Sequence, residues 1–205
     1  MMLRPGKILL ILLIPVALYA LAKGAMYFKA KSTVDDVVVS MANQADVRYA
    51  EISTDLSGAV TVSGITVQPR GFDDGVSIDS VRVASDDPLV FFFGGDWTSG
   101  KDTPPDSLSF MVSGVSVPLE SGFMRELAEG SGFGDDDPCR NGLKIEPPLL
   151  SKMGFDALTV DFDGGYRLDP AARTLSLDAH FEVRDVQGVT FTATLTDVDP
   201  EALVQ

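Results

Sequence analysis

The sequence predicts a mainly β protein with a few short helices, in which an antiparallel, twisted or curved sheet follows an N-terminal transmembrane helix. Alternating apolar and polar residues, separated by turns rich in Gly, Pro and Asp, predict the sheet. An apolar run at residues 8–22, interrupted by one proline, predicts the helix. Because helical spacing also recurs in two short internal segments, an α+β arrangement is the alternative.

The N-terminal apolar run has two interpretations. Arg4 and Lys7 precede it, and Ala20-Leu21-Ala22 has the small-x-small spacing of a cleavable signal peptide. Alternatively, the helix continues past Lys23 and crosses the bilayer over residues 8–28, which is long enough for a hydrocarbon core of about 30 Å. We favour the uncleaved anchor because the residues after Lys23 stay compatible with a helix and run into another helical segment.

The chain divides into an N-terminal anchor, residues 1–31, and a β-rich domain, residues 32–205. Within the domain, an acidic loop at 130–142 joins two halves, 32–129 and 143–205. We expect the anchor to make a single pass through the inner membrane of a bacterium and the domain to lie in the periplasm. The lysines that follow the span depart from the positive-inside rule; with only one span, we still place the domain outside.

Charge is divided unequally between these two parts. Residues 1–32 carry five basic and no acidic side chains, whereas the remainder carries 11 basic and 30 acidic ones, a net charge of −19. An acidic domain repels phosphate backbones, so no nucleic-acid partner is expected. The single cysteine, Cys139, excludes a disulfide within the chain.

Two short elements are predicted to follow the anchor. Ser32 and Thr33 precede two aspartates at capping-box spacing, and apolar residues then recur at i, i+3, i+4 and i+7, which predicts an amphipathic helix over residues 32–41. Residues 45–53 carry Val47, Tyr49 and Ile52 and predict a strand.

A hairpin is predicted over residues 56–83. The apolar alternation slips by one position near Gly64 in the first strand and at Asp79-Ser80 in the second. An antiparallel hairpin places these slips at the same level if it pairs Val67 with Val76, Ile65 with Ile78, Val62 with Val81, and Val60 with Val83. The slips predict either that the two ends of the hairpin are covered on opposite faces, or that the strand twists sharply at Gly64.

The first hairpin strand has a counterpart fifty residues later. Residues 60–67 (VTVSGITV) resemble residues 110–117 (FMVSGVSV), and both segments slip phase at Ser-Gly. This similarity predicts two strands of the same shape in one architecture. After the second copy, Leu119, Phe123 and Leu127 predict a helical face that ends before Gly130.

The last third of the chain predicts a three-stranded antiparallel meander with one apolar and one polar face. Asp169–Ala172 and Asp185–Gly188 are its predicted turns. The apolar positions are Leu158, Val160, Phe162, Tyr166 and Leu168 in the first strand, Leu175, Leu177, Ala179, Phe181 and Val183 in the second, and Val189, Phe191, Ala193 and Leu195 in the third.

Motifs that specify a reaction are missing from the sequence. It contains no nucleophile elbow, no P-loop and no dinucleotide fingerprint, and one Cys with one His is too few for a structural zinc site. The acidic run 135–137 lacks the spaced ligands of a calcium loop and is expected to be a solvated loop. We therefore predict no cofactor, no metal and no catalytic residue, and expect that the protein is not an enzyme.

His180 offers the one alternative to this expectation. The predicted meander places His180 opposite Asp163 on the polar face, with Thr192 beside it on the third strand. Such a row could exchange protons with a substrate. We favour an exposed cross-strand pair, worth a few tenths to about 1 kcal/mol.

Five consecutive apolar residues form the candidate binding segment: Leu89, Val90, Phe91, Phe92 and Phe93. A run of this kind is usually part of a core. Its other interpretation is contact with a hydrophobic ligand or with the membrane, because so apolar a segment is not left in water.

The order of these features resembles the opening of AsmA-like bacterial envelope proteins. The resemblance lies in the basic start, the single anchor, the segment DLSGAVTVSGITVQP with its partner VSIDSVRV, and the terminal MGFDALTVDFDGGYRLDPAARTLSLDAHFEV. It implies an anchored periplasmic protein with a curved, groove-like sheet, in a family whose larger members are implicated in lipid transport. It implies no catalytic or ligand-binding residue set.

These observations lead to one functional hypothesis and two alternatives. The first is a non-enzymatic, membrane-anchored envelope protein that handles lipid or another hydrophobic ligand in a β-sheet groove, with the inner-membrane bilayer as its surroundings. The second is a structural or assembly subunit of an envelope protein complex. The third is an enzyme that uses His180 and Asp163.

Overall fold

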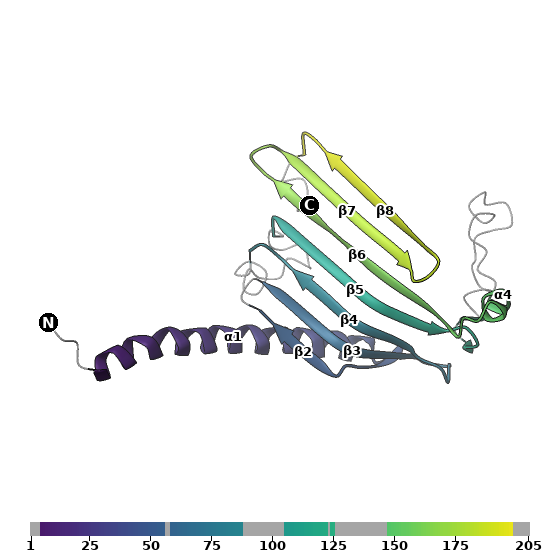
Figure 1. The fold of residues 1–205 in the computed structure, drawn as a ribbon, viewed down its shortest axis with the longest axis horizontal. Coiled ribbons are helices and arrows are strands. Elements are labelled where there is room, and N and C mark those ends of the chain that lie inside the picture. Colours follow the sequence, from purple (N-terminus) through teal and green to yellow (C-terminus); the bar gives the residue numbers. More distant parts are fainter. Residues whose placement is uncertain (1–4, 56–57, 88–104, 123, 126–146, 199–205) are drawn as a thin grey trace.

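The computed structural model describes residues 5–55, 58–87, 105–122, 124–125 and 147–198, with the side chains of the first helix described from residue 23 onward (Figure 1). The mainly antiparallel β fold that the sequence predicts is confirmed. The elements are α1 (Pro5–Met41), β1 (Ala45–Arg48), β2 (Glu51–Thr54), β3 (Ala59–Pro69), β4 (Val76–Ala84), β5 (Ser107–Pro118), α4 (Pro147–Lys152), β6 (Ala157–Asp169), β7 (Thr174–Val183) and β8 (Gln187–Leu195).

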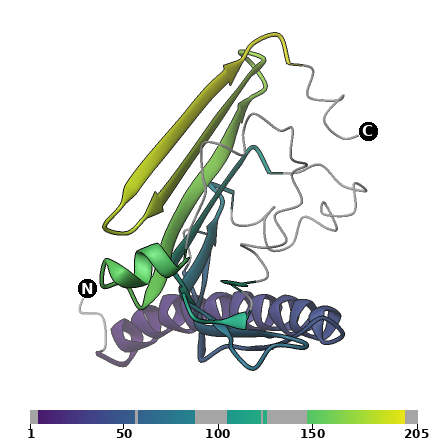
Figure 2. The same ribbon diagram turned by 90° about the vertical axis from the view of Figure 1, so that its right-hand side faces the viewer.

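All described strands belong to one eight-stranded antiparallel sheet with the order β1-β3-β4-β5-β6-β7-β8, in which β2 also pairs with β3. The sheet twists strongly, and α1 lies beside the β2–β3 end (Figures 1 and 2). The two outer positions of the sheet are therefore different: one carries β1, β2 and α1, and the other is β8.

Helix α1 is continuous from Pro5 to Met41, so the separate helix predicted at residues 32–41 is wrong. Ser32 and Thr33 are not caps, because the preceding residues are already helical. Thr33 Oγ1 instead donates to the carbonyl of Lys29 at 3.1 Å, the bond that a hydroxyl makes inside a helix. Arg70 caps the other end, since its guanidinium donates to Ala42 O at 2.6 and 3.1 Å.

The predicted hairpin is confirmed, with all four pairs in the predicted register. The predicted strand 45–53 is divided into β1 and β2, which pair with β3 in one register on either side of Tyr49 and Ala50. The division lies opposite Gly64, which has φ of +63° and approaches Ala50 so closely that a Cβ would stand 2.8 Å from the alanine Cβ.

The phase slips do not send the apolar side chains to opposite faces, so that interpretation of the hairpin is wrong. Strand β6 alternates regularly, and it pairs with β5 through Val112–Phe162 and Val115–Val160 with a register shift between them. Both valines of β5 therefore share the face of Val160 and Phe162. The inserted residue at Ser113-Gly114 is a β-bulge, which shifts the phase and so keeps the apolar residues on one side.

The same irregularity extends into β4. Ser77 pairs with Ser116 and thus with Thr159 on the polar face, whereas Val81 pairs with Val112 on the apolar face. Ser77 and Val81 are four positions apart, and a regular strand would place both side chains on the same face of the sheet. The slips in β3, β4 and β5 thus form one line across the sheet, near Gly64, Asp79 and Gly114, which stops at β6. We call it the bulge line.

The internal repeat now has a structural explanation. Strand β4 lies between the two copies, and corresponding residues of the copies pair with the same β4 residue. Val62 and Val112 both pair with Val81, while Val60 and Phe110 both pair with Val83. The prediction of two strands of the same shape is confirmed, and Gly64 and Gly114 have nearly equal φ values of +63° and +64°.

The meander β6–β8 follows the prediction with one correction. Leu168 pairs with Leu175 and Asp163 with His180, as predicted. His180 faces Thr190 rather than Thr192, because a tight three-residue turn between Val183 and Gln187 shifts β8 by two positions. Beyond β5, a helical turn begins at Ser121, whose hydroxyl accepts from the amide of Met124 at 3.1 Å; the predicted helical residues after 125 lie outside the described part of the chain.

Candidate functional site

One apolar strip crosses the whole sheet. Directly paired residues of an antiparallel sheet share a face, and two neighbouring rows of such pairs run from β2 to β8. The first row is Ile52–Val62–Val81–Val112–Phe162–Phe181–Val189, and the second is Thr54–Val60–Val83–Phe110–Gly164–Ala179–Phe191. With strands about 4.8 Å apart, the strip is roughly 29 Å long.

The first end of the apolar strip lies beneath α1. Ile52 packs with Met26 and Ala30 of the helix, and these three side chains are only 6–7% exposed. A depression of about 490 Å³ opens beside them, between α1 and β2, with Lys23, Tyr27 and Glu51 among its lining residues. Thr54 stands at the same end, with its buried hydroxyl unpaired in the described structure.

The middle of the apolar strip is formed by two phenylalanines from adjacent strands. The rings of Phe110 and Phe162 lie 5.1 Å apart at an angle of 42°, within the range of favourable aromatic contacts. Phe110 lies over Gly164, where a Cβ would come within 3.2 Å of the ring and 2.7 Å of the Asp178 carbonyl. The absence of a side chain at Gly164 therefore leaves room for the Phe110 ring.

The far end of the apolar strip is open. Phe181 is 44% exposed, Val189 58% and Phe191 59%. In the same part of the sheet Leu195 is also exposed. An exposed group of large apolar side chains is a usual mark of a surface that binds something.

A polar cluster holds α1 against the sheet. Lys31 Nζ lies 2.9 Å from Asp35 Oδ2 and 3.1 Å from Tyr49 Oη, and Tyr49 donates to Asp35 Oδ1 at 2.5 Å. The hydrogen bonds from Tyr49 and then from Lys31 lower the pKa of Asp35, and the bond to Asp35 raises the pKa of Lys31. Because Tyr49 occupies the break between β1 and β2, the cluster joins the helix to the bulge line.

A second polar cluster fixes the last bulge of that line. The amide of Gly114 donates to Asp161 Oδ1 at 2.7 Å, and Arg184 binds the same carboxylate through two nitrogens at 2.9 to 3.1 Å. The Gly114 amide is the main cause of the lowered pKa of Asp161, followed by Arg184. The Gly114 amide in the bulge thus has its hydrogen-bond partner on the polar face, and the apolar face stays free of polar atoms at this point.

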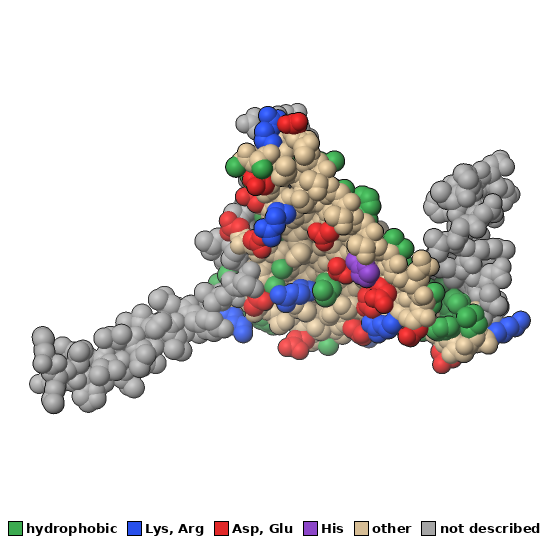
Figure 3. Space-filling view, turned by 45° about the horizontal axis from the view of Figure 1, so that its top comes forward, with side chains coloured by type: hydrophobic (Ala, Val, Ile, Leu, Met, Phe, Trp, Pro, Cys, Tyr) green, Lys and Arg blue, Asp and Glu red, His purple; other side chains and the backbone are tan. Residues whose placement is uncertain are grey.

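The predicted site residues are only partly described. Leu89–Phe93 lie outside the described residues, in the connection between β4 and β5. His180 and Asp163 do pair, but His180 lies on an exposed face among acidic side chains (Figure 3). Its Nδ1 is 2.9 Å from Thr190 Oγ1, and its Nε2 is 3.8 Å from Glu182. This exposed position does not provide the water-excluded pocket that the enzyme alternative requires.

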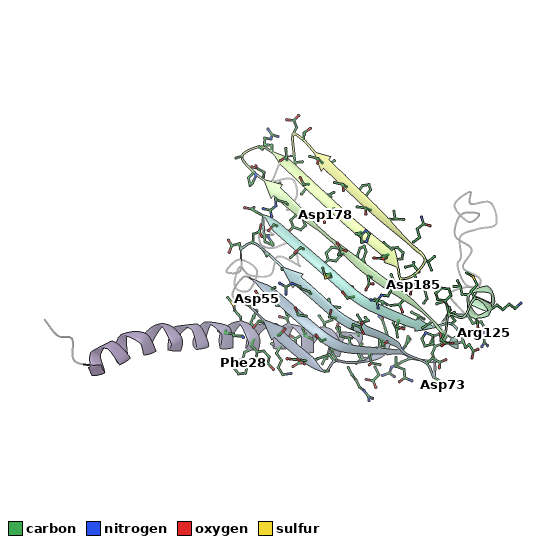
Figure 4. All side chains as sticks on the ribbon, in the orientation of Figure 1. Phe28, Asp55, Asp73, Arg125, Asp178 and Asp185 are labelled. Carbon is green, nitrogen blue, oxygen red and sulfur yellow. The ribbon has the colours of Figure 1, made fainter. Side chains whose placement is uncertain are left out.

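Two further features are absent from the same described residues. No group of three His, Cys, Asp or Glu residues there could hold a metal ion. Nor does any described helical stretch have the length and apolarity needed to cross a membrane; most of the predicted span, residues 8–22, lies outside the described side chains. At the end of that span, Tyr27 and Phe28 stack edge to face on α1. Phe28, labelled in Figure 4, is 72% exposed.

Comparison of the chain with protein-family models, curated proteins and solved structures gives no match. The functional hypothesis therefore rests on the geometry of the described residues. Sequence reasoning missed the apolar strip, although its parts were predicted: the hairpin register, the repeat and the meander together define it. The missing signal was the pairing of β5 with β6, which joins the two halves of the chain.

Proposed function

We propose that this protein is a non-enzymatic, membrane-anchored envelope protein that binds the acyl chains of a lipid along the apolar strip. The single observation that supports this function is the continuity of the strip from α1 to β8. An acyl chain needs an extended, mostly apolar surface, because burial of an unpaired polar atom costs free energy. Thr54 is the one polar side chain in the two rows of the strip, and it lies at the end covered by α1.

The two ends of the apolar strip suit transfer to or from a membrane. One end lies beside α1, the helix whose N-terminal part is the predicted inner-membrane anchor. The strip's length of roughly 29 Å is close to the hydrocarbon thickness of a bilayer, about 30 Å. With the predicted anchor in the inner membrane, the strip would lie on the periplasmic side. The resemblance to AsmA-like proteins, whose larger members are implicated in lipid transport, supports a lipid-binding role.

Mass spectrometry of the full chain, released from mild detergent, tests the proposal. We expect lipid to co-purify, and we expect Phe191→Ser to reduce its retention roughly tenfold, because the substitution removes a large apolar contact. Thr194→Ser is the matched control, since it lies on the same strand but on the polar face. Absence of bound lipid from the unaltered protein, or equal losses in both variants, would contradict the function.

The second hypothesis, an assembly subunit of an envelope complex, is favoured by a different observation. Strand β8 ends the sheet and is exposed along almost its whole length. This edge can bind a protein whether or not the apolar strip binds lipid.

A further inference from the structure

The backbone of β8 offers an unpaired hydrogen-bonding edge. The amide of Arg184 donates to Thr159 O at 2.9 Å, so the backbone of Arg184 faces β6. Backbone direction alternates along a strand, which turns Val183 and the other odd-numbered residues of β7 toward β8. Their β8 partners are odd-numbered too. The outward-facing residues of β8 are therefore Gly188, Thr190, Thr192 and Thr194, and no described strand lies on that side.

This edge lacks the features that usually prevent strand addition. Natural proteins protect exposed edges with charged side chains, prolines, bulges or covering elements. The sheet's other edge has such protection, because β1 and β2 carry Asp46, Arg48 and Glu51 and pack against α1. Strand β8, with the sequence QGVTFTATL, carries no charge and no proline over nine residues, and its pairing with β7 has no bulge.

The charges around the β8 edge specify the partner. Four carboxylates lie near it: Asp178 and Glu182 on the polar face of β7, Asp185 in the turn before β8, and Asp197 just after the end of β8. Asp178 and Asp185 are labelled in Figure 4. In the described structure none of the four forms an ion pair with a lysine or an arginine. Glu182 lies near a histidine, with its Oε2 3.8 Å from His180 Nε2.

Three acidic side chains farther inside the sheet differ in this respect. Asp161 is paired with Arg184, Asp86 with Arg167, and Asp55 with Arg82, at distances between 2.7 and 3.4 Å. Negative charge without a basic partner therefore lies next to the unpaired backbone edge, although Asp79 and Asp163 inside the sheet also lack an ion pair in the described structure. A strand added there would meet acidic groups on its polar face and Val189, Phe191 and Leu195 on its apolar face.

We infer that the β8 edge binds an extended segment of a partner protein whose side chains alternate between basic and apolar. The segment adds a ninth strand to the sheet: its backbone pairs with residues 188, 190, 192 and 194, its basic side chains face the four carboxylates, and its apolar side chains extend the apolar strip. Main-chain bonds of this kind supply affinity, and the alternating side chains supply specificity. This interaction does not depend on lipid binding.

The test uses the full chain in a neutral detergent and three synthetic nine-residue peptides: alternating Val and Lys, alternating Val and Glu, and the Val/Lys peptide with a central proline. We expect only the first to bind and to slow amide hydrogen exchange at the four outward-facing residues. Equal binding of the proline peptide or the Glu peptide, or binding without protection of these amides, would overturn the inference. Protection of the same amides by self-association without peptide would assign the edge to a second copy and would overturn it as well.

A pair of variants at one position isolates the backbone contribution. Thr192→Pro removes an outward-facing N–H without disturbing the bonds to β7, and we expect it to weaken binding of the Val/Lys peptide about tenfold, the effect of one lost backbone hydrogen bond. Thr192→Val keeps that N–H and should bind within about twofold of the unaltered chain. If the proline variant does not fold, exchange at the four amides of the unaltered protein decides the question.

Discussion

The two edges of the sheet share one apolar face but differ in what covers it. At the β1–β2 edge, α1 buries Ile52 to 7% exposure, and the Lys31–Asp35–Tyr49 cluster holds the helix in place. At the β8 edge, Val189 continues the same row at 58% exposure. A residue's place along the row, rather than its type, therefore decides whether it stabilises the fold or is available to a ligand.

The largest expected effect comes from one aliphatic truncation made at each end of the first row. Ile52→Ala should lower the free energy of unfolding by about 2–3 kcal/mol, because it leaves a cavity under α1. Val189→Ala should lower it by less than about 0.5 kcal/mol, because the side chain is mostly in water already. Urea unfolding followed by circular dichroism measures both. Equal losses would mean that the two ends are equally packed, contrary to the comparison.

The bulge line should show the next largest effect. Gly114→Ala would force a side chain into the left-handed region at φ of +64° and against the Asp79 carboxylate, at a cost of about 2 kcal/mol or more in unfolding free energy. Gly71→Ala is the control, since φ there is +92° but no atom lies within 4 Å of the added Cβ; we expect about 1 kcal/mol. If Gly71→Ala proved the more damaging in thermal unfolding, the close approach at Gly114 would have no energetic importance.

The cluster that holds α1 should make the covered edge sensitive to acid. The pKa of Asp35 is lower in the folded protein than its usual value of 3.8, so the unfolded chain takes up a proton first as the pH falls. The stabilisation by Asp35 is therefore complete well above pH 4 and is lost as the pH decreases through the folded-state pKa. Tyr49→Phe removes the main cause of the shift and should flatten this part of the pH profile.

Guanidinium unfolding at several pH values between 2.5 and 7 would measure that change. Tyr166→Phe is a suitable control, because Tyr166 hydrogen-bonds a backbone carbonyl, Pro105 O at 2.9 Å, rather than a carboxylate. The Asp35 assignment fails if Tyr49→Phe and Tyr166→Phe change the acid dependence alike.

The sequence predicts the two separate halves of this molecule better than it predicts their union. Hairpin register and meander register depend on local alternation and short turns, and both were predicted correctly except for the two-position shift at Thr190. The slips at Gly64 and Asp79-Ser80 were ambiguous, because one extra residue and a change of face give the same pattern within a hairpin. Only β6, which lacks the insertion, distinguishes them, and its pairing with β5 spans a sequence separation that alternation does not encode.

The smallest expected effect belongs to His180, the only histidine of the chain. Its side chain is 36% exposed, with Thr190 and Glu182 as neighbours on an open face. His180→Gln retains polar contacts of similar size, so we expect the free energy of unfolding to change by less than about 0.5 kcal/mol and lipid retention to stay unchanged. The opposite face of the same strand provides the contrast: Phe181→Ser should reduce lipid retention and lower the free energy of unfolding by about 1 kcal/mol, because the ring is only 44% exposed. If His180→Gln abolished lipid retention while Phe181→Ser did not, the lipid would bind to the polar face of the meander rather than to the apolar strip.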